Sequence, residues 1–481
     1  MKKVIKTAIG IALLLGLAGC AKDNNHGLSA KNPVIITIWH YYNGAQMEEF
    51  DALVKEFNET EGMKKGIVVE AFSRGGVNEL GKAVEDSLAG KVGSDKIPNA
   101  CSVYADNAYQ IDKQGMAVDL SKYLTPEEIS QYEDAYIDEG RFPTEKELKL
   151  FPIAKSTEVF AINKTDWEKF AQATGADTSS FSTWEGIVET AKAYYEWTDS
   201  LTAEPEDGKA FFGRDAFANY MIIGSKQLGH EIFSVKDGKM NLDFDKGAMR
   251  RLWDNYYVPY VNGYFAAYGR FRSDDVKTGD LLSFVGSTSS ITYFPSSVTK
   301  EDGTNYQIEN DIYPLPNFEG TDPCAVQQGA GMLVLKSDET REYAAVEFLK
   351  WFTNADTNLE FATNSGYLPV KKEAREKERM EKFIEAHSDQ ENEMLRKCLE
   401  TGFDVVGNYS LYTTKPFENG GEARELLNSS MWDKAIEDRA KVEAAIASGK
   451  TRKEAVDPFV TDENFELWYE DTYNKLKAFG E

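Results

Sequence analysis

Short apolar runs alternate with amphipathic segments along the first hundred residues of the chain. The runs at 34–39, 67–72 and 100–104 predict buried strands, and the first of them is rich in β-branched residues. Between the first two, apolar residues recur at helical spacing from Met47 to Phe57, and a second helical pattern covers 78–89. Strands that alternate with helices predict a parallel sheet with right-handed crossovers, so this part of the chain is predicted to be α/β.

Polar side chains follow each of these strands. His40 and Tyr41 come after the first, Ser73 after the second and Asp106 after the third. In open α/β sheets, ligands bind beyond the carboxyl ends of the strands. We therefore expect these four residues to face a binding cleft, with solvated loop positions as the alternative.

Prolines and glycines divide the middle of the chain. Pro314 and Pro316 forbid helix, so 313–318 is predicted to run extended. Gly329 stands shortly before the apolar run 332–335, where it lets backbone approach a ligand closely or turn sharply. A helix is expected at 342–354 and another extended segment at 367–370. Extended segments of this kind are typical of a chain that passes between two lobes, and 481 residues are too many for one core.

Two local predictions concern the segments on either side of the strand expected at 159–162. Residues 125–150 are charged, and we expect them to be mostly helical and on the surface. Ser182 is predicted to cap a helix, with Glu185 at the reciprocal position of a capping box.

The N-terminus predicts secretion. Lys2, Lys3 and Lys6 precede an apolar run at 8–18 that is too short to span a bilayer, and Leu17-Ala18-Gly19-Cys20 follows. The last four residues resemble a bacterial lipobox, which implies a signal peptide at 1–19 and a lipidated Cys20. Residues 20–32 would then be a tether holding an extracytoplasmic lipoprotein on the membrane. The alternatives are an uncleaved anchor or a chance cysteine.

Composition excludes several partners and cofactors. A formal net charge of −26 argues against binding nucleic acid or anionic lipid. Besides Cys20 there are only Cys101, Cys324 and Cys398, which are too few for a disulfide framework. One disulfide between two of them remains an alternative. We expect instead that these three cysteines are buried and act as small apolar residues. The four histidines are scattered singly, so the sequence shows no zinc-type cluster. Neither a metal nor an organic cofactor is implied.

The chain has a crossover, a strand preceded by glycines, a helix that covers this strand and a second crossover, in this order. This order resembles that of family 1 of the extracellular solute-binding proteins of ABC importers. The match is sharpest at 150–164 and in Gly366-Tyr367-Leu368-Pro369-Val370. It implies that 151–154 is the first hinge strand. The resemblance implies an α/β, periplasmic-binding-protein-like fold, in which two α/β lobes are joined by three crossover strands with a ligand cleft between them. The first lobe would comprise 33–150 and 317–369, and the second 151–316 and 370–481.

The same resemblance implies further cleft residues. Ser156, followed by Thr157, stands where maltose-binding relatives have a sugar-binding carboxylate and glycerol-3-phosphate-binding relatives have a serine. Ser287 lies in the segment where sugar binders often carry a stacking tryptophan. The remaining candidates are a backbone contact at Gly329, a cleft tyrosine, two cleft aromatics and a phosphate-binding arginine: Gly329, Tyr367, Phe217, Tyr220 and Arg424. These residues also have structural alternatives, such as turn closure, capping or core packing.

We expect a monomeric, non-enzymatic protein that binds a carbohydrate (a sugar, oligosaccharide or polyol) and delivers it to the membrane subunits of an ABC permease. Ser156, Ser287 and Arg424 favour glycerol-3-phosphate or another phosphorylated polyol as the alternative. Against that alternative, those relatives have a glutamate where this chain has Ala105. A lipid-anchored enzyme acting on glycans, with Asp106 and Glu158 as its carboxylate pair, is the candidate from another class, and no nucleophile elbow or H-E-x-x-H motif supports it.

Overall fold

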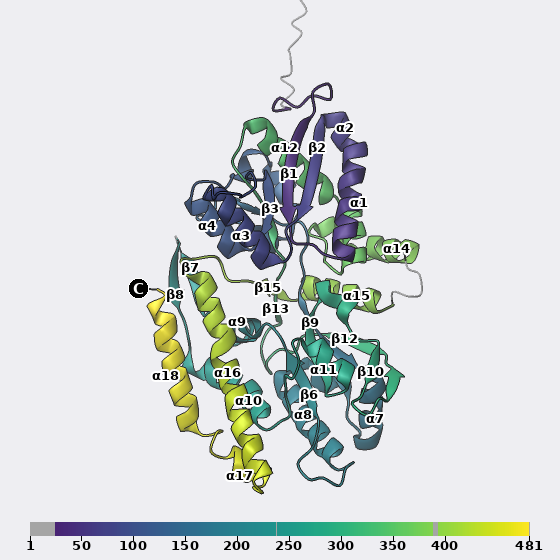
Figure 1. Ribbon diagram of the computed structural model, residues 1–481, viewed down its shortest axis with the longest axis vertical. Helices are drawn as coiled ribbons and strands as arrows, with labels where there is room; N and C mark the ends of the chain where they lie inside the picture. The colour runs from purple at the N-terminus through teal and green to yellow at the C-terminus, as the bar shows by residue number, and fades with distance from the viewer. Residues whose placement is uncertain (1–24, 237, 388–392, 481) are drawn as a thin grey trace, which may run out of the picture.

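The computed structural model describes residues 25–236, 238–387 and 393–480, and two lobes are stacked along its long axis (Figure 1). Each lobe is built on its own sheet. The signal peptide, Cys20 and the first part of the tether lie outside the described residues. Along the described chain, no helix has the length and apolar character that a bilayer crossing requires.

The first lobe contains a five-stranded sheet in the order β2-β1-β3-β14-β4. Its strands are β1 (Val34–His40), β2 (Ile67–Ser73), β3 (Ala100–Val103), β4 (Leu150–Phe151) and β14 (Gly331–Val334). The first three are parallel, as predicted, and β14 runs antiparallel to β3. The helices of this lobe are α1 (Ala45–Glu59), α2 (Glu61–Lys65), α3 (Val77–Leu88), α4 (Ala105–Lys113), α12 (Glu339–Phe352) and α13 (Ala355–Ser365).

Successive side chains of β14 point to opposite faces of the sheet, and both faces are buried. Met332 and Val334 join the core formed with α1, α12 and α13, whereas Leu333 joins the core formed with α3 and α4. A strand with helices on both faces must be apolar throughout, which explains the unbroken apolar run in the sequence.

The second lobe contains a four-stranded sheet in the order β12-β5-β9-β6. The strands are β5 (Glu158–Asn163), β6 (Ala210–Arg214), β9 (Leu281–Ser287) and β12 (Asn310–Pro314). Two hairpins accompany it, β7 (Phe233–Lys236) with β8 (Lys239–Leu242) and β10 (Ser297–Thr299) with β11 (Asn305–Gln307). The helices are α7 (Lys164–Thr174), α8 (Trp184–Asp199), α9 (Phe217–Gln227), α10 (Lys246–Val261), α11 (Arg272–Thr278), α15 (Glu393–Asn408), α16 (Gly420–Ala447), α17 (Arg452–Val456) and α18 (Asp462–Ala478).

Three extended segments connect the lobes and lie side by side. The first runs from β4 to β5, the second from β12 to β14, and the third follows α13. Lys155 of the first pairs with Leu368 of the third, and Ser156 pairs with Gln328 of the second. Beside them, β13 (Cys324–Val326) pairs with β15 (Ser410–Tyr412). These backbone bonds hold the crossovers together at the junction of the lobes.

Residues that follow the third crossover still contact the first lobe. Lys371 bridges to Tyr132, and Arg375 forms an ion pair with Glu133. The next elements are a 3-10 helix at Lys372–Arg375, α14 (Lys377–His387) and then α15, which packs on β12.

Two local predictions are wrong. Between 125 and 150, only α5 (Pro126–Ile129) and α6 (Asp134–Glu139) are helical, and Tyr132 and Tyr136 are buried, because the apolar residues of this segment pack into the first-lobe core. The N-cap of α8 is Thr183, whose hydroxyl accepts a hydrogen bond from the Gly186 N–H at 3.1 Å. Ser182 instead ends a 3-10 helix at Thr178–Ser182. Other short 3-10 helices lie at Leu120–Lys122 and Thr288–Tyr293.

The three described cysteines agree with the expectation from the sequence. Cys101, Cys324 and Cys398 are buried free thiols. Burial raises the pKa of the Cys101 thiol to about 12, which keeps it protonated and unreactive.

Candidate functional site

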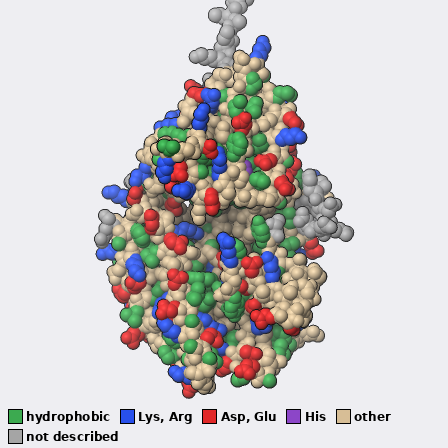
Figure 2. Space-filling view, in the orientation of Figure 1, with side chains coloured by type: hydrophobic (Ala, Val, Ile, Leu, Met, Phe, Trp, Pro, Cys, Tyr) green, Lys and Arg blue, Asp and Glu red, His purple; other side chains and the backbone are tan. Residues whose placement is uncertain are grey.

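A cleft of about 670 Å³ lies between the two lobes, where Figure 2 shows the surface hollowed. The cleft collects side chains from both lobes and from all three crossovers, which is the arrangement expected of a small-molecule site. Six of the sequence-predicted residues line it: Asp106, Ser156, Ser287, Gly329, Tyr367 and Arg424.

Three other predicted residues lie behind the cleft wall. His40 is fully buried, and burial lowers its pKa to about 4, so the imidazole is neutral. Ser73 donates its hydroxyl to the carbonyl of Tyr42 at 3.0 Å. Tyr41 does not line the cleft, but its hydroxyl lies 3.2 Å from the hydroxyl of Tyr367 and so helps to hold that residue.

The remaining three predicted residues serve packing. Thr157 donates its hydroxyl to the Val326 carbonyl at 2.8 Å and thereby joins two crossovers. Phe217 and Tyr220 belong to the second-lobe core, where the Tyr220 hydroxyl donates to the Leu252 carbonyl at 2.8 Å. Every residue from Phe217 to Ser225 in α9 is buried, so the sequence pattern offered no polar face that would distinguish core from cleft.

Arg424, on α16, is held by a buried chain of polar groups. Its guanidinium donates to Asn219 Oδ1, and Asn219 Nδ2 donates to Glu158 Oε1 at 2.6 Å. The other oxygen of Glu158 accepts from Arg214 Nη2 at 2.9 Å. Arg214, Glu158 and Asn219 are each at most 5% exposed. One donor of Arg424 is therefore committed to the protein, and burial lowers the pKa of this guanidinium.

Asp106 lies in the first turn of α4, in the first lobe, and lines the cleft on the side opposite to Arg424. Burial raises the pKa of Asp106 to about 6, Arg424 counteracts the rise, and Glu139 and Glu422 add to it. At neutral pH the carboxylate is mostly ionised. The cleft thus holds an anion on one lobe and a cation on the other.

The crossovers form the floor of the cleft. Lys155 Nζ lies 2.5 Å from Glu139 Oε2 and donates to the Gly329 carbonyl at 2.8 Å, while Gln327 donates to the same carboxylate oxygen at 2.8 Å. Gly329 has a φ of +96°, and a Cβ there would lie 2.9 Å from the Ala154 carbonyl. Only glycine fits this close approach of two crossovers without strain.

Several lining residues were not identified from the sequence. Tyr104, which is 41% exposed, ends the third predicted strand, and its place at a strand end is the signal that could have found it. Asn219, Phe233, Gln327 and Phe417 also line the cleft, and the ring centroids of Phe233 and Phe417 are 5.3 Å apart. They come from distant parts of the chain and carry no pattern of their own.

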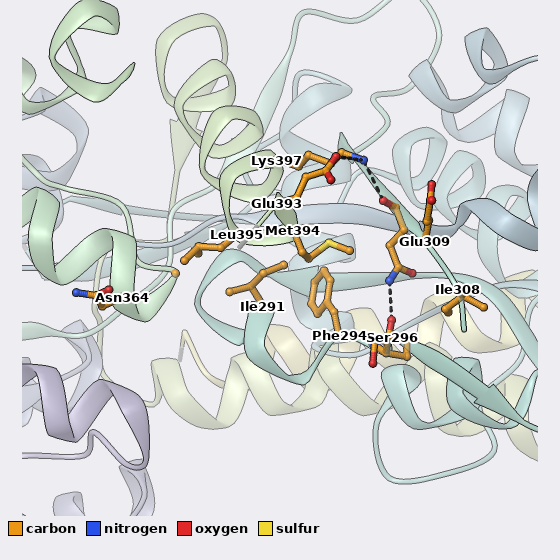
Figure 3. Close-up of a pocket in the computed structure, with 13 residues that line it drawn as sticks. Ile291, Phe294, Ser296, Ile308, Glu309, Asn364, Glu393, Met394, Leu395 and Lys397 are labelled. Atoms are coloured by element: carbon orange, nitrogen blue, oxygen red, sulfur yellow. Dashed lines mark hydrogen bonds and ion pairs between the residues drawn. The ribbon is translucent and has the colours of Figure 1, made fainter. Parts of the chain in front are cut away.

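Figure 3 shows a second cavity, of about 380 Å³. Ser289 lines the cleft whereas Ile291, of the same 3-10 helix, lines the second cavity. Its walls mix apolar and polar side chains, and its Lys397 forms an ion pair with Asp311 at 2.8 Å. None of the predicted site residues lines it, so the interlobe cleft is the candidate site. Among the described residues, no group of three or more His, Cys, Asp or Glu side chains is arranged to hold a metal ion.

Comparison with known proteins gives a family match. A family model described as bacterial extracellular solute-binding protein matches residues 52–388. A search of curated proteins finds no match.

Solved structures share the fold. UgpB from Mycobacterium tuberculosis, in complex with glycerophosphocholine, is 17% identical with a TM-score of 0.65, over 92% of this chain and 99% of that one. The cyclic α-maltosyl-1,6-maltose binding protein from Arthrobacter globiformis is 16% identical with a TM-score of 0.61, over 92% and 99%. An ABC substrate-binding protein from Listeria monocytogenes, in complex with cycloalternan, is 14% identical with a TM-score of 0.64, over 93% and 100%. At these identities the likeness shows the shared fold.

Proposed function

This chain belongs to the bacterial extracellular solute-binding proteins, the substrate-binding proteins of ABC-type transport, and we propose that its interlobe cleft captures a carbohydrate for delivery to a membrane permease. The ligand is a sugar, an oligosaccharide or a polyol. Binding favours the closed arrangement of the lobes, because a ligand in the cleft contacts both of them.

The observation that carries this proposal is the mixed lining of the cleft. Hydroxyls of Ser156 and Ser287, the carboxylate of Asp106 and the guanidinium of Arg424 converge there with aromatic rings such as Tyr104 and Tyr367. Sugars present hydroxyls that both donate and accept, together with C–H faces that stack on aromatic rings. A hydroxyl-rich neutral ligand can therefore satisfy the acidic and the basic group at once.

A phosphorylated polyol is the second candidate, and Arg424 is the observation that favours it. A guanidinium is a strong partner for phosphate, and the two serines add hydrogen-bond donors. Two features favour a neutral ligand instead. Arg424 already donates to Asn219, and Asp106 together with Glu139 places negative charge in the same cleft.

We propose binding rather than catalysis. A glycan-cleaving enzyme would need a pair of carboxylates, for which Asp106 and Glu158 are the candidates. Glu158 does not line the cleft, and both of its oxygens accept hydrogen bonds from Arg214 and Asn219. A carboxylate held in this way has no access to a glycosidic bond.

We propose that the protein is a monomer anchored outside the cell membrane through a lipidated Cys20. The N-terminal sequence supports the lipid anchor. Metabolic labelling with radioactive palmitate should label the protein, and the Cys20→Ser variant should take up no label. Equal labelling of the variant would exclude this anchor.

A thermal-shift screen of the protein beginning after Cys20 tests the ligand class. Glucose, maltotriose and sorbitol represent neutral ligands, and glycerol-3-phosphate represents phosphorylated ones. A ligand at one hundred times its dissociation constant stabilises the protein by about 2.7 kcal/mol, which moves a melting curve visibly. We expect a neutral sugar to give the shift.

Variants then assign the site. Tyr367→Ala and Ser156→Ala should reduce the sugar-induced shift, whereas Ser296→Ala, in the second cavity, is the matched control and should retain it in full. A shift confined to glycerol-3-phosphate, and lost in Arg424→Met, would establish the second candidate instead. No shift with either group would contradict both.

A further inference from the structure

A segment of the second lobe reaches across to the first lobe beside the cleft. Residues 413–419, which we call the strap, connect β15 to α16. The strap is fixed to the second lobe at both ends and at its centre. β15 pairs with β13, which packs on α9, and Phe417 is 3% exposed beside Phe233.

Two charged residues of the strap bind the first lobe. Lys415 Nζ lies 3.1 Å from Asp138 Oδ1 and 2.8 Å from Glu145 Oε1. Glu418 forms an ion pair with Lys113 at the end of α4. The strap therefore holds the lobes together through side chains, independently of the three backbone crossovers.

The strap also forms part of the cleft wall. Thr413, Thr414 and Phe417 line the cleft, and the Oγ1 atom of Thr414 is buried. Where the strap enters α16, a Cβ on Gly420 would lie 2.9 Å from Asp106 Oδ1 of the first lobe. The lobes cannot separate along this edge unless the ion pairs of Lys415 and Glu418 break.

We propose that the strap is a gate on the cleft, latched by these ion pairs, and that unlatching is a step in the exchange of solute. The inference rests on the proposed function, because it concerns the regulation of the same cleft. The partners are partly exposed, with Lys415 at 26%, Glu418 at 54% and Lys113 at 46%. Pairs of this kind are weak individually and are screened by salt, so the latch holds the closed state yet opens readily.

Chemical modification of a thiol on the strap tests the latch without any ligand. The test uses the protein that begins after Cys20, since the described fold starts at Asn25. In that protein the native cysteines are buried, so a maleimide reports on the introduced Thr414→Cys thiol. We expect the Thr414→Cys thiol to be modified slowly. The double variant Lys415→Ala and Glu418→Ala should increase the rate of modification roughly three- to tenfold, because each exposed ion pair contributes little. Lys453→Ala, which removes an exposed pair on α17, is the control and should leave the rate unchanged.

A charge exchange checks that the pairing itself is responsible. Lys113→Glu alone should accelerate modification, and Lys113→Glu combined with Glu418→Lys should restore the slow rate. Thermal unfolding of each variant shows that it is folded. An unchanged rate in the Lys415 and Glu418 double variant, or failure of the exchange to restore the slow rate, would overturn the latch.

Release of a solute then tests the gate. For bound maltotriose, the double variant should show a dissociation rate that rises by a similar factor in a stopped-flow chase. Faster modification with an unchanged release rate would show that the strap is not a step in exchange. Because modification requires no solute, failure of the latch and failure of sugar binding are separate results.

Discussion

The ionised Asp106 carboxylate should make the protein less stable at neutral pH than a variant with an uncharged side chain at this position. Burial raises the pKa of Asp106 from 3.8 to about 6, so between these values the folded chain binds more protons than the unfolded chain. The contribution of Asp106 to stability must therefore fall as pH rises through this interval. A pKa shift of this size corresponds to a change of up to about 3 kcal/mol in the free energy of unfolding, and this stabilisation is fully lost above pH 6.

The Asp106→Asn variant has nearly the same shape and no such titration. Urea unfolding followed by circular dichroism at pH values from 4 to 8 should give equal stability near pH 4 and an advantage of up to about 3 kcal/mol for the variant above pH 7. Asp433→Asn, at an exposed position of α16, is the control and should show no advantage of this kind. An advantage that is absent above pH 7, or that does not vary with pH, would refute the reasoning.

The same variant separates stability from binding. If the carboxylate accepts hydrogen bonds from solute hydroxyls, Asp106→Asn should weaken sugar binding while it stabilises the fold. Functional sites commonly retain groups that cost stability. A variant that gained stability and kept its full affinity would show that Asp106 does not contact the solute.

Further expected outcomes concern the cleft and the buried network. Tyr367→Ala should weaken sugar binding at least tenfold, which is about 1.4 kcal/mol, in titration calorimetry, and unchanged affinity would remove Tyr367 from the site. Glu158→Gln should lower the unfolding free energy by about 3–5 kcal/mol, because the Arg214 charge then stays buried without a counter-charge, and a small change in the urea midpoint would argue against that pairing. Sugar should also reduce the radius of gyration in small-angle scattering, and identical profiles with and without sugar would count against closure.

Most of the fold could be predicted from local patterns. The strand β1 and the helix α1 were found because apolar side chains repeat with a period set by the backbone itself, so the sequence displays the buried face directly. Prediction failed where burial did not follow such a period. Tyr132 and Tyr136 lie in a charged, irregular segment, and only the neighbouring elements of the first lobe explain why these rings are buried.

Some residues of the candidate site could likewise be predicted from local patterns, and others could not. Asp106 could be found at a strand end, and Gly329 was marked by its position before an apolar run. Asn219 could not be found, because its importance comes from hydrogen bonds to Glu158 and Arg424, which stand 61 and 205 positions away. Phe217 and Tyr220 are aromatic, as cleft residues often are, and only their packing in the second-lobe core shows that they do not line the cleft.

The sequence by itself therefore determined the α/β class, the alternation of strands and helices, the extended crossovers and the glycine between them, because each depends on backbone preferences and short-range periodicity. Only the tertiary structure decided which polar residues meet. The cleft, the chain from Arg214 to Arg424 and the strap ion pairs join side chains from distant parts of the sequence. Their energies depend on burial and on distances of a few ångströms, which no local pattern encodes.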